Sequence, residues 1–189
     1  MKLTTQLLAA LALASQITAC VPVVVGGAAA GGTMAADRRT SGVFVEDQNI
    51  KLKASHSIDD VVTDLSHVNV TSYKGNVLVT GEVPDEITKT KVGDAVKAVE
   101  SVRNVTNELA IGPESSLSSR TNDSYITSKV KAQFVSENRF PANYVKVVTE
   151  NSVVYLMGYV TQAEGDAAAE IARNTTGVDK VVKVFEYLP

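Results

Sequence analysis

Hydrophobic positions in the second part of the chain follow a pattern that occurs twice. The alternating apolar runs at residues 68–70 and 77–83 recur at residues 145–147 and 154–160, displaced by 77. The block at residues 101–105 recurs at residues 177–181, displaced by 76. Repetition at this spacing indicates two copies of one small unit, and one loop deletion accounts for the change in displacement.

Each copy is predicted to begin with an amphipathic helix. In the second copy, residues 122–124 (Asn-Asp-Ser) supply capping side chains, and Ile126, Val130 and Phe134 then fall on one face at i, i+4 and i+8. The first copy has a weaker signal, with either Asp47 or Asn49 as the cap. Its inward face comprises Ile50, Ala54, Ile58 and either Val61 or Val62.

Two strands joined by a tight turn follow each of these helices. The turns are placed at residues 73–76 and 149–152, where Gly and Asn supply the positive φ that such turns require. Gly81 and Gly158 are expected to let the chain turn as the second strand ends. Second helices are predicted at residues 85–100 and 162–175, and third strands at residues 105–111 and 181–187.

The predicted fold class is α+β, with the order α-β-β-α-β in each copy. Amphipathic helices can cover only one face of a sheet, so each copy should place two helices on one face of a three-stranded mixed sheet. Units of about 70 residues are near the lower limit for an independent core, and the two copies are therefore expected to pack together. Residues 113–120, which are rich in Ser, are expected to link them.

The first residues have the pattern of an export signal. Lys2 precedes an apolar run at residues 7–14, which is too short to span a bilayer. The run leads to Ile17-Thr18-Ala19-Cys20, which resembles a bacterial lipobox and contains the only cysteine. The resemblance implies cleavage of residues 1–19, a thioether-linked diacylglycerol on Cys20 and an acyl chain, such as palmitate, on its new amino group. The alternative is an ordinary secretory signal with a coincidental cysteine.

Residues 20–45 are expected to form a flexible tether behind the acylated cysteine. Residues 21–36 carry no charge and include two Gly-Gly pairs, which disfavour a stable helix. Val21 stands where lipoproteins retained in the inner membrane carry Asp, so outer-membrane sorting is expected, with the protein facing the periplasm. A single cysteine permits no internal disulfide, and the fold must depend on apolar packing.

Composition excludes several other functions. A net charge of −3 argues against nucleic acid as a partner. His56 and His67 are the only histidines, and without a second ligand at metal-site spacing both are interpreted as surface or loop residues rather than metal ligands. No Gly-x-Ser-x-Gly elbow or phosphate-binding loop occurs. We therefore expect no enzymatic activity, no metal and no cofactor.

The repeated unit resembles the BON domain, and residues 46–112 and 121–188 are the two matching segments. The resemblance is carried by Val154-x-Leu156-x-Gly158-x-Val160, by the Ala-rich helix that follows and by the Val-x-x-Val ending. A lipobox followed by Asp-Arg-Arg-Thr-Ser-Gly at residues 37–42 and two BON units resembles the dual-BON outer-membrane lipoproteins. This family implies anionic phospholipid as partner, concentration at division sites and maintenance of the outer-membrane barrier. In it, the first helix of the second BON domain contacts lipid.

The corresponding helix here has an outward face with mixed character. At 100° per residue, the positions opposite the inward face are Tyr125, Ser128, Ala132 and Val135, flanked by Lys129 and Lys131. Tyr favours the headgroup region, and lysines attract anionic lipid, so these six residues are the candidate lipid-binding site. The alternative is an ordinary solvent-facing surface. The family often carries Trp at the position of Tyr125, which implies shallower insertion here.

Two classes of function remain open from the sequence. One is an anionic-lipid-binding lipoprotein that maintains the outer membrane. The other is a protein-interaction module that docks on outer-membrane assembly machinery or on regulators of septal peptidoglycan hydrolases.

Overall fold

The structure, a computed structural model, describes residues 37–62 and 66–189. The predicted signal peptide, Cys20 and the tether as far as residue 36 lie outside the described residues. Within residues 37–62 and 66–189, no helix combines the length and apolar character that a transmembrane segment needs.

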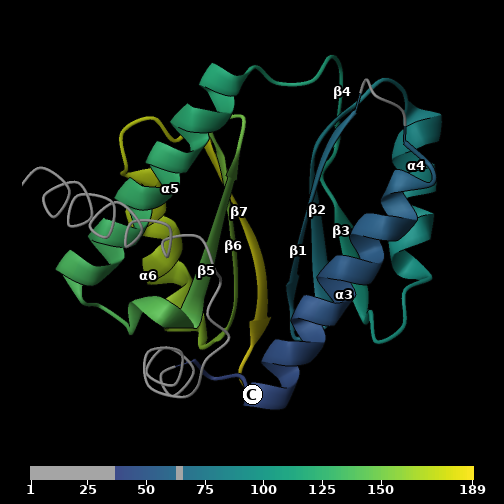
Figure 1. Ribbon diagram of the computed structural model, residues 1–189. Coiled ribbons are helices and arrows are strands. Elements are labelled where there is room, and N and C mark those ends of the chain that lie inside the picture. The colour runs from purple at the N-terminus through teal and green to yellow at the C-terminus, as the bar shows by residue number, and fades with distance from the viewer. Residues whose placement is uncertain (1–36, 63–65) are drawn as a thin grey trace, which may run out of the picture. The chain divides into compact units, whose positions relative to one another are not determined.

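The first repeat contains two helices and a mixed sheet (Figure 1). Strand β2 is central, pairing antiparallel with β1 and parallel with the short strands β3 and β4. The predicted third strand is divided into β3 and β4, and Leu109, which lies between them, is buried. The elements are α3 (Ser41–Asp59), β1 (His67–Tyr73), β2 (Asn76–Val83), α4 (Glu86–Lys97), β3 (Asn104–Asn107) and β4 (Ala110–Ile111).

The second repeat follows the same α-β-β-α-β order, but its third strand is continuous and a 3-10 turn precedes its first strand. Strand β6 pairs antiparallel with β5 and parallel with β7. The elements are α5 (Leu117–Glu137), a 3-10 turn η2 (Ala142–Tyr144), β5 (Val145–Glu150), β6 (Val153–Val160), α6 (Gln162–Arg173) and β7 (Lys180–Tyr187). The predicted α+β class, the repeat and the turn at residues 73–76 are confirmed, and the second turn lies one residue later than predicted, at residues 150–153.

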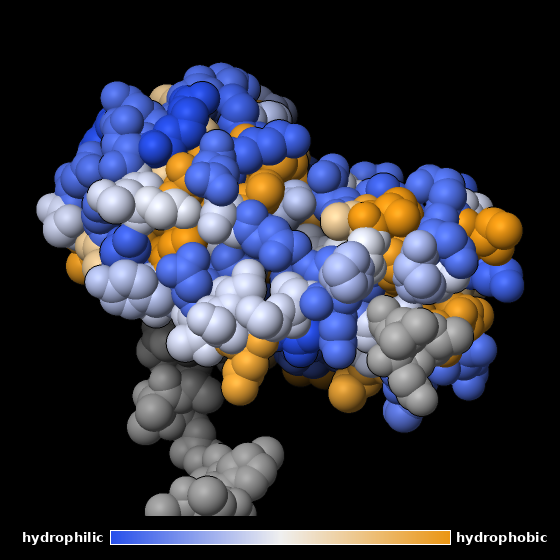
Figure 2. All heavy atoms as spheres, turned by 90° about the horizontal axis from the view of Figure 1, so that it is seen from above, coloured by the Kyte–Doolittle hydropathy of each residue, from blue (hydrophilic) through white to orange (hydrophobic). Residues whose placement is uncertain are grey.

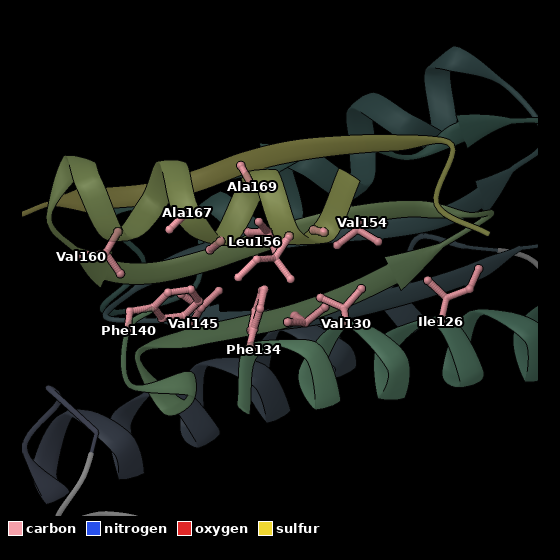
Figure 3. Close-up of a cluster of buried hydrophobic side chains, with 14 residues drawn as sticks. Ile126, Val130, Phe134, Phe140, Val145, Val154, Leu156, Val160, Ala167 and Ala169 are labelled. Atoms are coloured by element: carbon pink, nitrogen blue, oxygen red, sulfur yellow. The ribbon is translucent and has the colours of Figure 1, made fainter. Parts of the chain in front are cut away.

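Each repeat has its own hydrophobic core between its helices and its sheet. In the second repeat, Ile126, Val130 and Phe134 of α5 point toward β5 and β6 (Figure 3). Small alanines on α6 allow that helix to lie close to the sheet. In the first repeat, Ile50, Ala54 and Ile58 make the corresponding contacts. The predicted inward faces of α3 and α5 are therefore confirmed.

The sheet faces that the helices leave uncovered pack against each other. Four buried side chains, Tyr73, Leu78, Tyr155 and Met157, form the centre of this seam between the sheets. Val148, Val153, Tyr159, Val182 and Val184 pack around them. Both faces of β2 and β6 are thus buried. This explains why β6 is almost continuously apolar in sequence, whereas β2 also buries the polar residues Thr80 and Glu82. The expectation that the repeats pack together is confirmed.

A buried aspartate on the first helix of each repeat holds the neighbouring β-turn. Asp123 accepts hydrogen bonds from the backbone N–H groups of Asn151 and Ser152, at 2.9 and 2.8 Å. Asp47 does the same for Lys74 and Gly75. Both aspartates look like helix caps in sequence, and that interpretation was wrong: the caps are Thr40 and Ser116.

The helix starts therefore lie earlier than predicted. Helix α3 begins at Ser41 and α5 at Leu117, so part of the expected linker at residues 113–120 belongs to α5. The prediction for Gly81 and Gly158 also needs correction. Gly81 lies within β2, opposite Val68, and a Cβ there would collide with the carbonyl oxygen of His67. Gly158 lies within β6, opposite Val145, and a Cβ there would collide with the carbonyl oxygen of Tyr144.

Candidate functional site

Helix α5 presents one long face to the outside of the second repeat. Its 21 residues span about 31 Å at 1.5 Å per residue. Ser116 caps the start, and Asn138, in the left-handed conformation, ends the helix. Because the inward face is fixed by Ile126, Val130 and Phe134, the positions opposite to it must face outward.

Five of the six candidate residues are exposed on this outward face, hereafter the α5 outer face. Tyr125 is 63% exposed and Val135 is 68% exposed. Ser128, Lys131 and Ala132 are also exposed, and Lys129 is half-buried. The predicted clustering of these residues is therefore present, whereas their contact with lipid stays a prediction.

Leu117 extends this face and was missed in the sequence. It is 80% exposed and lies on the same side as Val135, because 18 residues at 100° each make five full turns. The prediction started the helix at residues 122–124 and so left Leu117 in the linker. The Ser-rich stretch before it contains Ser116, whose side chain accepts from Ser119 N, and this cap was the available signal.

The two lysines of the α5 outer face differ in their surroundings. Lys129 donates to the carbonyl oxygen of Thr176, and its Nζ lies 4.8 Å from the centre of the Tyr125 ring. It therefore helps to hold the ring in place. Lys131 is exposed and, together with Val135, borders a pocket of about 510 Å³.

This pocket combines apolar and cationic groups. Phe44 of α3 and Val145 of β5 contribute apolar surface, and Arg39 and Lys146 contribute charge. Burial, together with the nearby charges of Arg39 and Lys51, lowers the pKa of Lys146 to about 8. An anionic group in the pocket would interact favourably with Lys131 and Lys146.

Arg38 and Arg39, the Arg-Arg pair before α3, connect the two repeats beside this pocket. Arg38 makes a bidentate pair with Glu164 at 2.8 Å and stacks over Tyr144, both in the second repeat. Arg39 instead pairs with Asp47 of the first repeat at 2.9 Å, and also with Asp37. The segment leading to the predicted anchor is thus fixed close to the C-terminal half of α5.

Figure 2 shows how exposed apolar residues are distributed over one face of the molecule. In the face shown in Figure 2, they lie singly or in small groups among polar residues. Scattered exposed apolar side chains are normal in a soluble surface and indicate no binding site by themselves. The α5 outer face differs from such single residues because Leu117, Tyr125 and Val135 lie on one side of a helix together with two lysines.

The histidines occupy different environments. His56 is exposed on α3, as expected. The interpretation of His67 as a surface or loop residue was wrong. It is the first residue of β1, its side chain is only 17% exposed, and it lies beside two buried glutamates.

The repeated α-β-β-α-β unit can now be compared with known domains. The BON domain matches residues 46–113 and again residues 122–189. The chain belongs to the BON-domain family. Its first BON domain carries α3 and its second carries α5.

Several curated proteins are similar to this chain along most of their length. Outer membrane lipoprotein DolP of Haemophilus influenzae is 39% identical over 171 residues, covering 89% of each chain. The 21 kDa hemolysin of Actinobacillus pleuropneumoniae is 32% identical, covering 82% of this chain and 81% of the relative. Osmotically-inducible protein Y of Escherichia coli is 29% identical, covering 74% and 72%. The chain thus resembles DolP-type outer-membrane lipoproteins.

Proposed function

We propose that this protein is a lipid-anchored outer-membrane lipoprotein that faces the periplasm and binds anionic phospholipid through the α5 outer face. The observation that carries the proposal is the exposure of Tyr125 and Val135 beside Lys129 and Lys131. The lipobox-like sequence ending at Cys20 and the similarity to DolP support the anchor and the location.

The first BON domain offers an internal comparison, because α3 is the counterpart of α5. With Asp47 equivalent to Asp123, Tyr125 corresponds to Asn49 and Val135 to Asp59. Helix α3 does expose Val45 and Leu52, but two acids, the half-buried Glu46 and the exposed Asp59, offset its lysines. An anionic bilayer would therefore attract α5 more strongly than α3.

The expected affinity of the α5 outer face is modest. Two lysines near an anionic surface contribute about 2 kcal/mol together. Partial insertion of Leu117, Tyr125 and Val135 adds about 1 kcal/mol each, roughly half the value for full burial. The sum of about 5 kcal/mol corresponds to a dissociation constant near 0.2 mM.

A lipid anchor would make this weak contact sufficient. Cys20 precedes Asp37 by 17 residues, which span at most about 60 Å. A tether of this length gives an effective concentration in the millimolar range, above the expected dissociation constant. Asp37 and Arg39 are fixed beside the pocket that Lys131 and Val135 of α5 border. This position favours contact of the α5 outer face with the membrane that holds the anchor.

Vesicle co-sedimentation of the compact unit Gly32–Pro189 tests this proposal. The fragment lacks Cys20 but keeps Arg38 and Arg39, which contact both domains. We expect binding to vesicles that contain phosphatidylglycerol, weaker binding as salt increases, and little binding to neutral vesicles. The double variant Tyr125→Glu, Val135→Glu should lose binding.

A matched control places two charges on the outer side of α3, as Asn49→Glu with Leu52→Glu. This variant should bind vesicles about as well as the unmodified fragment. Equal pelleting with neutral and anionic vesicles, insensitive to salt, would contradict the proposal. It would favour a module that docks on outer-membrane assembly or division proteins.

The resemblance to dual-BON lipoproteins also supports a cellular role in outer-membrane integrity at division sites. A fluorescent fusion should concentrate at the septum, and a deletion strain should become sensitive to large antibiotics that an intact outer membrane excludes. The Tyr125→Glu, Val135→Glu variant should fail to restore resistance if lipid binding underlies the role. A uniform distribution and unchanged resistance would contradict it.

A further inference from the structure

The seam between the two BON domains contains a cluster of three potential metal ligands. His67 begins β1 and Glu82 lies on β2, both in the first domain, whereas Glu150 ends β5 in the second. One ligand atom from each residue lies within 4.8 Å of the other two. The cluster therefore joins the two domains.

The geometry of the cluster is close to that of a zinc site. His67 Nδ1 lies 3.3 Å from Glu82 Oε2 and 3.9 Å from Glu150 Oε1. Zinc bonds to imidazole nitrogen and carboxylate oxygen are about 2.0–2.2 Å long, so neighbouring ligands in a tetrahedron lie about 3.4 Å apart. Small rotations of the two glutamate side chains would bring all three atoms to this spacing.

The charge of the cluster also calls for a cation. The side chains of Glu82 and Glu150 are only 5% and 8% exposed. Among the ion pairs of residues 37–62 and 66–189, both glutamates pair with His67 alone, and neither pairs with a lysine or arginine. Two buried carboxylates that share one imidazole are costly unless further positive charge is present.

Neighbouring groups hold the ligands in orientation. Glu82 accepts from Ser115 N at 3.0 Å and from the Asn151 side chain. Glu150 Oε2 accepts from Thr80 Oγ1 at 3.1 Å and from the Asn69 amide at 2.9 Å, which leaves Oε1 directed toward His67. Such outer contacts are typical of metal sites, where they fix the direction of the ligand atoms.

Asn69 also lies against the second ring nitrogen. Its Nδ2 is 3.3 Å from His67 Nε2. With a metal on Nδ1, Nε2 carries the proton, and the Asn69 amide must present its oxygen there. Rotation of the amide achieves this but gives up the Asn69 hydrogen bond to Glu150, so Thr80 is then the side chain that orients Glu150 Oε2.

We propose that His67, Glu82 and Glu150 bind one divalent transition-metal ion, for which Zn²⁺ is the best match, and that the ion bridges the two BON domains. The combination of one imidazole with two carboxylates suits zinc better than the harder cations Mg²⁺ and Ca²⁺, which prefer all-oxygen sites. A pocket of about 400 Å³, bordered by His67 and Glu150, gives the ion access and leaves room for a water as fourth ligand.

Metal titration of the full-length protein in detergent tests this proposal. After removal of metal with a chelator, Zn²⁺ binding is measured by calorimetry, and Co²⁺ binding by its visible absorption. We expect one ion per chain and a melting temperature that rises with Zn²⁺. His67→Gln and Glu150→Gln should each weaken binding at least 10-fold and abolish the thermal shift.

The matched control is His56→Gln, because His56 is the only other histidine and is exposed. This variant should bind zinc like the unmodified protein. Absence of stoichiometric binding at 0.1 mM Zn²⁺ would overturn the proposal, as would equal binding by His67→Gln or Glu150→Gln. Two separate ligand variants keep the test decisive if one of them fails to fold.

Discussion

Replacement of Asp47 by Asn should strongly destabilise the first BON domain. The Asp47 carboxylate accepts from Lys74 N and Gly75 N at 2.9 Å each, from Ser72 Oγ at 2.6 Å and from Arg39 Nη1 at 2.9 Å. Only 2% of the residue is exposed. Water therefore cannot replace these partners when the carboxylate is lost.

The magnitude follows from which groups lose an acceptor. An asparagine keeps one oxygen, so its NH₂ group must face either Lys74 N–H or Gly75 N–H. A buried donor without an acceptor costs about 1–3 kcal/mol. Breaking a buried ion pair costs about 3–5 kcal/mol, but Arg39 retains Asp37 as a partner. We therefore expect a loss of about 3 kcal/mol in the free energy of unfolding.

Urea unfolding of the unit Gly32–Pro189, followed by circular dichroism, measures this loss. With a denaturant slope of about 2 kcal/mol per M, the midpoint should fall by about 1.5 M. Asp94→Asn, an exposed position on α4, is the control and should change stability by less than about 0.5 kcal/mol. An Asp47→Asn effect no larger than that of the control would refute the role assigned to this carboxylate.

Two further predictions concern pH and backbone packing. Burial would raise the pKa of Asp47, but hydrogen bonds from Ser72 and from the turn outweigh it and lower that pKa below 3.8. Its stabilising contribution is therefore complete above this value and is lost as the pH falls below it, so urea midpoints should drop as the pH is lowered below 3.8 and drop less in Asp47→Asn. Gly158→Ala should cost at least about 3 kcal/mol, because its Cβ meets the Tyr144 carbonyl, whereas Gly112→Ala, in open space, should be nearly neutral in the same assay.

The parts of the fold that depend on local sequence could be predicted. The turns at Gly75 and Asn151 follow from residues that tolerate positive φ, and both adopt it. The inward face of α5 follows from the spacing of Ile126, Val130 and Phe134. The same periodicity placed Tyr125, Lys131 and Val135 on the opposite side, where the structure has them.

The parts that depend on distant contacts could not be predicted. Asp123 has the chemistry of a helix cap, and only the turn 28 residues later shows that it caps backbone N–H groups there instead. Because the predicted helix began too late, Leu117 was left out of the candidate lipid-binding residues. His67 and Glu150 are 83 residues apart, and no spacing rule connects them before the sheets are packed together.

The contacts of the Arg-Arg pair have a mechanical consequence. A load applied through the N-terminal segment reaches Arg38, held by the second domain, and Arg39, held by the first, before it reaches α3. Tension is thus shared between both domains and resisted in shear by several charged contacts, rather than peeling one helix from its sheet. A pulling force on the N-terminal segment therefore acts on both domains before it can unfold the first turn of α3.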